Sequence, residues 1–250
     1  LLFFLVFLFF LYFCLVIKFD IHQGSACAVE FKHRRQSLRV EALQEVIVSA
    51  GAINSPQLLM LSGVGDADQL RRFGIDAIVD SPNVGQNLMD HLDVYVQQAC
   101  AQPLSLYKDL GWIGRLKIGA RWLYDQTGLG ATNHFEAGGF IRSCASQPYP
   151  DIQFHFLPVA IRYDGTAPSE GHGFQIHVGP MRSESRGYVS IKSSNPIEPP
   201  KINFNYMSHE SDFPTFRKAL RLSREILAQE ALKPYAGPEI QPGNNLVSDS

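Results

Sequence analysis

Short segments in which apolar and polar residues alternate open the first half of the chain. Ile17, Phe19 and Ile21 have polar neighbours, and the pattern returns over residues 28–31 and 37–42, with turn-forming or charged residues between the segments. A period of two residues is typical of β-strands. We therefore predict a small antiparallel meander.

A buried strand and two helices are expected next. Residues 45–51 form a continuous apolar stretch that predicts a strand buried on both faces. The following helix should begin at Ser55, whose hydroxyl can cap the first turn, and Pro56 suits that turn because no N–H is needed there. A second short helix is predicted over residues 67–73, ending at Gly74, which can adopt the left-handed conformation of a helix terminus.

The second half of the chain combines helical spacing with strand-like segments. Apolar residues over 112–126 predict a helix that lies against a sheet, and a last amphipathic helix is expected over residues 210–228. Between them, segments separated by Gly, Pro, Asn and Ser predict a broad antiparallel sheet. These segments are residues 134–141, 151–159, 173–180, 187–192 and 201–206. The pattern as a whole indicates the α+β fold class.

The composition is that of a globular protein. Of the 250 residues, 45% are hydrophobic and 18% are charged, which is enough apolar material for one sizeable core or two small ones. The net charge of -2 offers no basic surface for nucleic acid. The four cysteines are far apart and form no CxxC pair, so we expect free, buried thiols.

The start of the chain has an unusual composition. The first residue is Leu1, and residues 1–17 form an unbroken apolar run of mostly Leu and Phe. A membrane span needs about 20 apolar residues, and a signal peptide needs a positively charged start that is missing here. A third explanation, which we favour, is a truncated or mis-joined start, because the first residue is not Met.

One longer motif points to a family. Residues 51–65, GAINSPQLLMLSGVG, fix small, Ser, Pro and Gly positions across a strand, a turn and a helix, and they resemble the second signature of the glucose-methanol-choline (GMC) oxidoreductases. NVGQNLMDH (residues 83–91) and HFEAGGFIRS (residues 134–143) are similar to the members that act on choline. The resemblance covers residues 16–249 and stops where the apolar start begins, which is a second reason to treat that start as foreign to the fold.

This resemblance implies a Rossmann-type FAD-binding domain and a substrate domain built on an antiparallel sheet. We expect residues 1–14 to be a non-native or anchor segment, residues 15–90 to be the C-terminal portion of the FAD-binding domain, and residues 91–250 to be the substrate-binding domain. The sequence has no GxGxxG fingerprint after a strand, and the family's HPxGT-like segment with the catalytic histidine should lie beyond Ser250. We therefore assign no catalytic residue and expect the isolated chain to bind FAD weakly and to be inactive.

The activity that the resemblance implies is FAD-dependent oxidation of choline to betaine aldehyde, with hydride transfer to the flavin. The electron acceptor is not identified, and the family suggests association with the mitochondrial inner membrane or a bacterial cell membrane. Two alternatives stay open. One is a GMC oxidoreductase for another alcohol, and the other is a non-catalytic, membrane-attached remnant.

Choline carries a quaternary ammonium group, which cannot donate hydrogen bonds and needs an anion or aromatic faces around it. The family places a substrate-binding glutamate at the position of Glu136 and a histidine of the choline pocket at His155. From the strand pattern alone, Glu136 could face water or pair with Arg142, and His155 could be a core histidine. Phe135 and Phe140 are expected to be core residues.

For the FAD cofactor, the matching family positions are the backbone of Val16 and the small residues Ser49, Ala50 and Gly51. Small residues are needed there because the cofactor approaches the main chain closely. The alternative is that they merely end a buried strand in a tight turn.

Two further groups of polar residues are expected to be structural. Asp90 and His91 are adjacent, and adjacent residues of a strand face opposite sides, so they should not form a catalytic dyad. The spacing of His155, His172 and His177 matches no common zinc ligand set, so no metal is expected.

Overall fold

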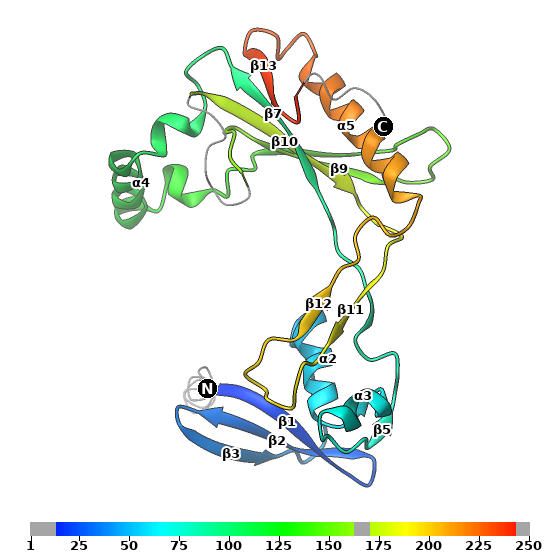
Figure 1. The fold of residues 1–250 in the computed structure, drawn as a ribbon. Coiled ribbons are helices and arrows are strands. Elements are labelled where there is room, and N and C mark those ends of the chain that lie inside the picture. The colour runs from blue at the N-terminus through cyan, green and yellow to red at the C-terminus, as the bar shows by residue number, and fades with distance from the viewer. Residues whose placement is uncertain (1–13, 163–170, 244–250) are drawn as a thin grey trace. The chain divides into compact units, whose positions relative to one another are not determined.

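The chain divides into two compact units. The computed structural model describes residues 14–162 and 171–243. Unit 1 consists of Leu1–Met89 and Ser185–Tyr206, and unit 2 consists of Asp90–Glu184 and Met207–Ser250 (Figure 1). The chain thus leaves unit 1 near residue 90, where we placed a domain boundary, and returns to it later, which we did not predict.

The apolar start of the chain lies outside the described residues, because these begin at residue 14. Our expectation that the start is foreign to the fold therefore stays a prediction. Within residues 14–162 and 171–243, no helix is long and apolar enough to cross a membrane.

Unit 1 begins with the predicted antiparallel meander. Its strands are β1 (Cys14–His22), β2 (Ser25–His33) and β3 (Gln36–Glu41), in the order β1-β2-β3. The two residues between β1 and β2, Gln23 and Gly24, both have positive φ, as tight two-residue hairpins with the right twist require. The meander is confirmed.

The apolar stretch after β3 does not form the buried strand that we predicted. Residues 45–50 belong to no strand, and Leu43 and Ile47 are 97% and 78% exposed. A strand buried on both faces needs neighbouring strands, and in the described part of the chain none pairs with this stretch.

Helix α2 (Gly51–Leu61) begins earlier than we predicted. Pro56 lies inside the helix, where its missing N–H cannot bond a preceding carbonyl. The hydroxyl of Ser55 accepts the N–H of Ala50 at 3.1 Å instead of capping the first turn. The helix was therefore predicted correctly, but its first residue was predicted wrongly.

The rest of unit 1 surrounds α2. Helix α3 (Ala67–Arg72) is capped by the carboxylate of Asp66, which accepts the N–H of Gln69 at 2.8 Å. It ends before Gly74, whose φ of 70° is the predicted left-handed turn. The remaining strands are the parallel pair β4 (Val64–Gly65) and β5 (Val79–Asp80), and a sheet of order β12-β11-β6 made from β6 (Gln86–Leu88), β11 (Gly187–Ser190) and β12 (Lys201–Asn203).

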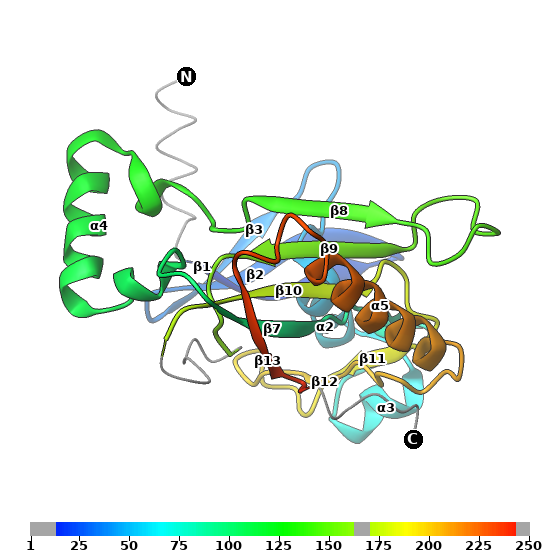
Figure 2. The same ribbon diagram turned by 90° about the horizontal axis from the view of Figure 1, so that it is seen from above.

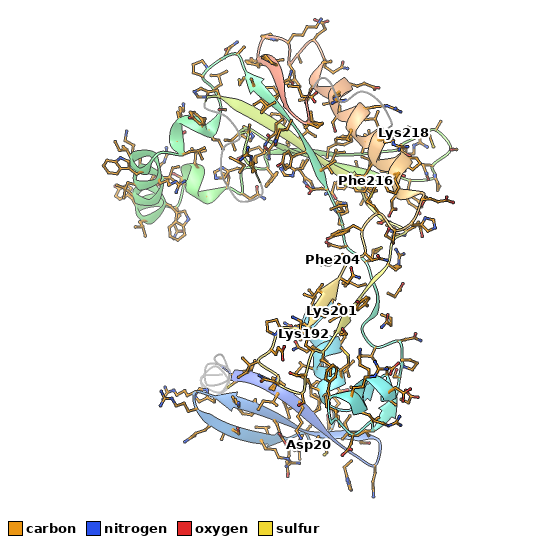
Figure 3. The ribbon with its side chains drawn as sticks, in the orientation of Figure 1. Asp20, Lys192, Lys201, Phe204, Phe216 and Lys218 are labelled. Carbon is orange, nitrogen blue, oxygen red and sulfur yellow. The ribbon has the colours of Figure 1, made fainter. Side chains whose placement is uncertain are left out.

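Strands β11 and β12 correct the prediction of one broad sheet. They belong to unit 1, where the ammonium of Lys201 lies 5.3 Å from the ring centre of Tyr188 (Figure 3). Ile191, just after β11, joins a buried cluster with Met60, Leu61 and Leu70. Alternation of apolar residues predicted these strands but could not say which sheet they join.

Unit 2 is built on a five-stranded antiparallel sheet. Its order is β13-β7-β10-β9-β8, so β10 is the central strand and is buried along its whole length. The strands are β7 (Val94–Cys100), β8 (Ala137–Ile141), β9 (Ile152–Leu157), β10 (Gly173–Pro180) and β13 (Ala236–Gln241). The strand segments predicted for β8, β9 and β10 are confirmed, whereas β7 and β13 were not predicted.

Helix α5 (Asp212–Leu227) covers one face of this sheet (Figure 2). Phe216, Ala219 and Leu227 are buried at helical spacing, and Figure 3 shows the side chain of Phe216 beneath the helix. Ala219 and Leu227 form the core with even-numbered residues of the strands, such as Val96 and Ile176. On β7, β9 and β10 the odd-numbered residues therefore face the other side of the sheet, whereas on β8 the even-numbered residues do, because Gly138 pairs with His155.

Helix α4 (Trp112–Asp125) does not lie against the sheet, contrary to our prediction. None of its residues is buried. Its neighbours are the short 3₁₀ helices η1 (Leu106–Asp109) and η2 (Gly128–Ala131), and Figures 1 and 2 both show it beyond the end of the sheet.

The cysteines differ from the prediction in one respect. Cys14, Cys27, Cys100 and Cys144 form no disulfide, but each is half-buried rather than buried.

Candidate functional site

The face of the unit 2 sheet opposite α5 carries a row of polar and aromatic side chains. Strand pairing sets His177 of β10 opposite Tyr95 of β7 on one side and opposite His155 of β9 on the other. His155 is in turn opposite Gly138 of the edge strand β8. Since Gly138 has no side chain, the row is left open at the β8 end.

A chain of hydrogen bonds fixes the imidazole of His177. The Oε1 atom of Gln175 accepts the N–H of Ile161 at 2.9 Å and a hydrogen from Nε2 of Gln97 at 2.7 Å, so the amide nitrogen of Gln175 must point the other way. That nitrogen lies 2.6 Å from Nε2 of His177, which therefore accepts. The Nδ1 atom then carries the proton and donates it to Oδ2 of Asp93 at 2.7 Å.

Aromatic rings surround the two histidines. The ring centre of Phe135 lies 5.9 Å from that of His155 and 5.6 Å from that of His177, in edge-to-face geometry. Tyr95 lies 5.5 Å from His177 on the other side. These distances are typical of aromatic pairs. The carboxylate of Asp93 thus lies beside histidine, phenylalanine and tyrosine rings on one face of the sheet.

His155 is held in its neutral form. Burial lowers the pKa of His155 below its ordinary value of 6.5. The carboxylate of Asp93 opposes this shift but does not cancel it. A neutral imidazole can accept a hydrogen bond, which an imidazolium cannot.

The predicted substrate residues are placed differently from each other. His155 lies in the row, as the resemblance implied, and the role given to it stays a prediction. Glu136 lies just before β8 and is exposed, as the strand pattern alone allowed, and in the described ranges it forms no ion pair; its substrate-binding role stays a prediction. Phe135 and Phe140 are 42% and 56% exposed and are not core residues.

The other polar residues named from the sequence lie outside the row. Asp90 and His91 are exposed in the connection between β6 and β7 and not in a strand, so the reason we gave for separating them was wrong. The Nδ1 atom of His172 bonds the Ser105 hydroxyl at 2.8 Å, away from His155. In the described part of the chain, no group of three or more potential metal ligands is found.

The residues predicted for the cofactor lie in unit 1. Val16 of β1 and Ala50, just before α2, line one cavity of about 430 Å³ together with Asn54. Ser49 and Gly51 flank Ala50 and are exposed. Gly51 has a φ of 80° with no atom within 4 Å of where a Cβ would be, so a ligand can approach its backbone closely.

These residues fit a dinucleotide. No side chain caps the start of α2, so its first N–H groups are available to an acceptor such as a phosphate. Val16 of β1 lines the same cavity as Ala50. The row of polar and aromatic side chains belongs to unit 2, whereas this cavity belongs to unit 1.

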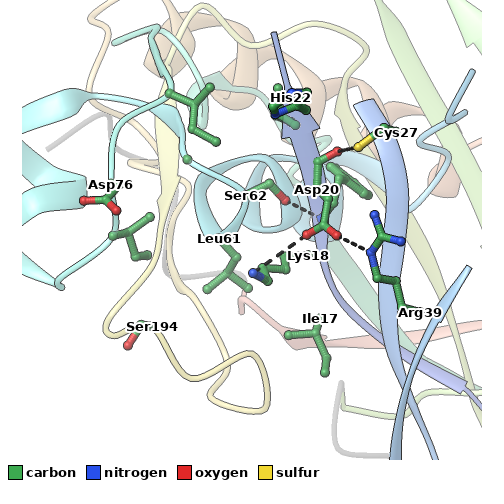
Figure 4. Close-up of a pocket in the computed structure, with 15 residues that line it drawn as sticks. Ile17, Lys18, Asp20, His22, Cys27, Arg39, Leu61, Ser62, Asp76 and Ser194 are labelled. Carbon is green, nitrogen blue, oxygen red and sulfur yellow. Dashed lines mark hydrogen bonds and ion pairs between the residues drawn. The ribbon is translucent and has the colours of Figure 1, made fainter. Parts of the chain in front are cut away.

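A larger cavity in unit 1, of about 880 Å³, carries no comparable chemistry (Figure 4). Three of its charged residues interact with one another. Asp20 accepts from Arg39 at 2.7 Å and lies 3.9 Å from Lys18, and the hydrogen bond from Arg39 lowers the pKa of Asp20. These ion pairs describe a structural surface.

Comparison with known proteins agrees with the fold and the motif. Two family models, both described as GMC oxidoreductase, match residues 8–93 and residues 183–250, together more than half of the chain. The first match reaches back into the start that we expected to be foreign. The chain combines an α+β fold with the motif at residues 51–65, and it belongs to the GMC oxidoreductase family.

Individual relatives support this assignment. The chain is 58% identical to an oxygen-dependent choline dehydrogenase of Brucella anthropi over 93% of its own length, and 51% identical to one of Rhizobium meliloti over 94%. It spans only 42% and 43% of those two proteins. Among solved structures, a formate oxidase of Aspergillus oryzae matches with a TM-score of 0.84 at 24% identity, covering 94% of this chain and 46% of that one, which shows the shared fold.

Sequence reasoning missed two members of the row, Asp93 and Tyr95, and considered a third, His177, only as a possible metal ligand. Asp93 directly precedes β7, a strand that we did not predict, so it had no context. A signal was present, because Tyr95 and Gln97 alternate with the apolar residues Val94 and Val96. That alternation places polar groups on one face of a strand.

Proposed function

We propose that this chain is part of an FAD-dependent alcohol dehydrogenase that oxidises choline to betaine aldehyde. The observation that supports this most is the carboxylate of Asp93 held at 2.7 Å from His177 among aromatic rings on an open sheet face. A quaternary ammonium ion is bound by these two features together, a nearby anion and aromatic faces. The identity of 58% with an oxygen-dependent choline dehydrogenase supports the same substrate.

Each residue of the row has a distinct task in this proposal. Asp93 supplies the negative charge, and its side chain is 28% exposed, so a cation can reach it while it is partly desolvated. Phe135 and Tyr95 provide ring faces for the methyl groups. His155, neutral because burial lowers its pKa, accepts a hydrogen bond from the alcohol hydroxyl and orients it.

FAD, when bound, accepts the hydride from the alcohol carbon. In unit 1, Val16, Ser49, Ala50 and Gly51 would hold the adenosine and phosphate part of FAD, with the N-terminal N–H groups of α2 as donors. The carboxylate of Asp93 also orients the imidazole of His177 through a hydrogen bond, and the ring of Phe135 packs edge-to-face against that imidazole.

Asp93 can be tested as the anion by comparing choline with its neutral isostere, in which a tert-butyl group replaces the trimethylammonium. In a complete enzyme that carries this segment and FAD, Asp93→Asn should raise KM for choline at least tenfold, since a pair of opposite charges about 4 Å apart in a partly desolvated site is worth more than the roughly 1.4 kcal/mol of a tenfold change. KM for the isostere should change little. Dye-coupled oxidation, run separately with choline and with the isostere, measures the two KM values.

Glu136→Gln is the matched control, because it removes an exposed carboxylate that directly precedes β8, as Asp93 directly precedes β7 of the same sheet. If Glu136→Gln weakens choline selectively and Asp93→Asn does not, the anion is Glu136, as the sequence suggested. If KM rises equally for choline and for the isostere in Asp93→Asn, the enzyme acts on another alcohol.

A further inference from the structure

Two buried glutamines next to His177 hold each other in one orientation. Gln97 and Gln175 are 0% and 1% exposed. Nε2 of Gln97 donates to the carbonyl oxygen of Ile161 and to Oε1 of Gln175, both at 2.7 Å. The N–H of Ile161 donates to the same Oε1 at 2.9 Å. This arrangement, called the glutamine lock below, consists of Gln97, Gln175 and the backbone of Ile161.

Neither amide of the glutamine lock can turn over without losing these bonds. If Gln175 turned, its NH2 group would face the N–H of Ile161 and the NH2 group of Gln97, so two hydrogen bonds would become two contacts between donors. If Gln97 turned as well, its oxygen would face the carbonyl oxygen of Ile161. Buried polar groups without partners are costly. Gln175 therefore keeps its NH2 group toward His177.

An unpaired oxygen shows that the orientation of Gln175 is maintained at a cost. Oε1 of Gln97 is buried, and in the described residues no donor reaches it. Folded proteins leave few buried polar atoms unpaired, and each such atom calls for an explanation. The explanation here is that Gln97 uses both of its N–H donors for the glutamine lock.

The glutamine lock excludes a second proton from His177. The amide nitrogen of Gln175 lies 2.6 Å from Nε2 of His177, and a protonated Nε2 would set two donors against each other. The carboxylate of Asp93, 2.7 Å from Nδ1, would by itself favour the charged imidazole. The lock opposes this effect, so His177 stays neutral.

Several titratable groups lie in or next to the row that contains His177. They are Asp93 and Tyr95 at β7, His155 of β9, His91 before β7 and the exposed Glu136 before β8. Asp93 is the member of this group that accepts a hydrogen bond from the imidazole of His177. The charge beside Asp93 therefore depends on whether His177 is neutral.

We propose that Gln175 is a positioning residue that keeps His177 neutral, so that the negative charge of Asp93 remains available to a cationic substrate. An imidazolium at 2.7 Å would form an ion pair with this carboxylate, which would then attract a quaternary ammonium ion much less. The neutral imidazole orients the carboxylate without cancelling its charge. The cationic substrate rests on the proposed function, whereas the state of His177 does not.

The glutamine lock also determines how cation binding depends on pH. A histidine beside a carboxylate ordinarily becomes charged at or above about pH 6.5, and cation binding would then weaken as the pH falls. With His177 held neutral, the affinity for a cation stays constant as long as Asp93 is ionised. The site therefore keeps its preference for a cation in mildly acidic solution.

Nitrogen-15 NMR of the full chain, labelled at histidine, reports the state of His177 without any substrate. Neutral and charged imidazoles differ in their nitrogen shifts, and His177→Gln identifies the signals. The parent chain should keep the neutral form, with the proton on Nδ1, from about pH 8.5 to about pH 5.5. Gln175→Glu still accepts from Ile161 and Gln97 but turns an acceptor toward Nε2, so His177 should be charged over this whole range.

Gln153→Glu is the charge-matched control. Gln153 pairs with Gly179, so it lies on the same sheet face as His177 and diagonally from it. The variant adds a carboxylate near His177 but leaves the glutamine lock intact, and His177 should stay neutral as in the parent chain. A charged His177 in the parent chain or in Gln153→Glu, or a neutral one in Gln175→Glu, would overturn the inference.

Tetramethylammonium, a cation without a reacting hydroxyl, tests the effect on the site. In a complete enzyme that carries this segment and FAD, its inhibition constant against choline should be about tenfold higher in Gln175→Glu than in the parent. In the parent it should not change between about pH 6 and about pH 8.5. If His177 responds as expected but tetramethylammonium binds both enzymes equally, Asp93 is not the anion of the site, and the proposed function fails while the glutamine lock stands.

Discussion

Gly85 offers a strict test of how unit 1 is assembled. It lies just before β6 with a φ of 81°, and its carbonyl accepts the N–H of Val189 in β11 at 2.7 Å. A Cβ at this position would be 2.1 Å from the carbonyl oxygen of Val189, a distance that real side chains do not reach. Gly85→Ala therefore forces β6 and β11 apart.

The size of the effect follows from four contributions. Left-handed φ costs a residue with a Cβ about 1–2 kcal/mol, and the more rigid unfolded chain returns about 0.4–1 kcal/mol. Pressing a methyl group into backbone adds about 1–3 kcal/mol, and the strained hydrogen bond from Val189 adds about 1 kcal/mol. Gly74→Ala shares only the first two contributions, since its φ is 70° and no atom lies within 4 Å of the added Cβ.

Hydrogen exchange at the Val189 amide measures the difference. Both tryptophans lie in unit 2, so their emission does not report on unit 1, and a two-unit chain need not unfold in one step. Exchange of Val189 should be much faster in Gly85→Ala than in Gly74→Ala, by about 2 kcal/mol in opening free energy or more. Equal exchange in the two variants would refute the close approach of β6 and β11.

Two further predictions concern unit 2. Because burial lowers the pKa of His155, its neutral form stabilises the fold above pH 6.5, and this stability is lost as the pH falls below that value. The midpoint of thermal denaturation, Tm, should therefore decrease less steeply with falling pH in His155→Gln than in the parent chain. Arg224 donates to both carboxylate oxygens of Glu239 at 2.9 and 2.8 Å, so Arg224→Met should cost about 3 kcal/mol in urea denaturation by leaving a buried carboxylate unpaired, and an unchanged midpoint would contradict this.

Elements with their own periodic signal could be predicted from the sequence. The meander of β1, β2 and β3 follows from alternation and short turns, and α5 follows from a buried stripe at helical spacing. The motif at residues 51–65 identified the family. These features depend on residues close together in the chain, so local pattern is sufficient.

Features that depend on distant partners could not be predicted. The apolar stretch at residues 45–50 has the composition of a buried strand, but in the described part of the chain no strand pairs with it. The spacing in α4 is amphipathic, yet spacing does not tell whether the apolar face meets a sheet or remains exposed. Strands β11 and β12 return to unit 1 because of pairing with β6, which lies far away in sequence.

The polar row of unit 2 illustrates why a site is harder to predict than a fold. His177 lies on the central strand, whose residues are all buried, so its sequence neighbourhood resembles a core. Its role depends on strand register, which places Tyr95 and His155 beside it, and on Gln175, whose amide fixes the tautomer that donates to Asp93. Register is set by residues on other strands, and the tautomer is set by Gln175 on the same strand, whose amide is oriented by Gln97 of β7. The family motif could locate His155, but only the pairing of β7, β10 and β9 joins it to a carboxylate, and that pairing makes the row a candidate cation site.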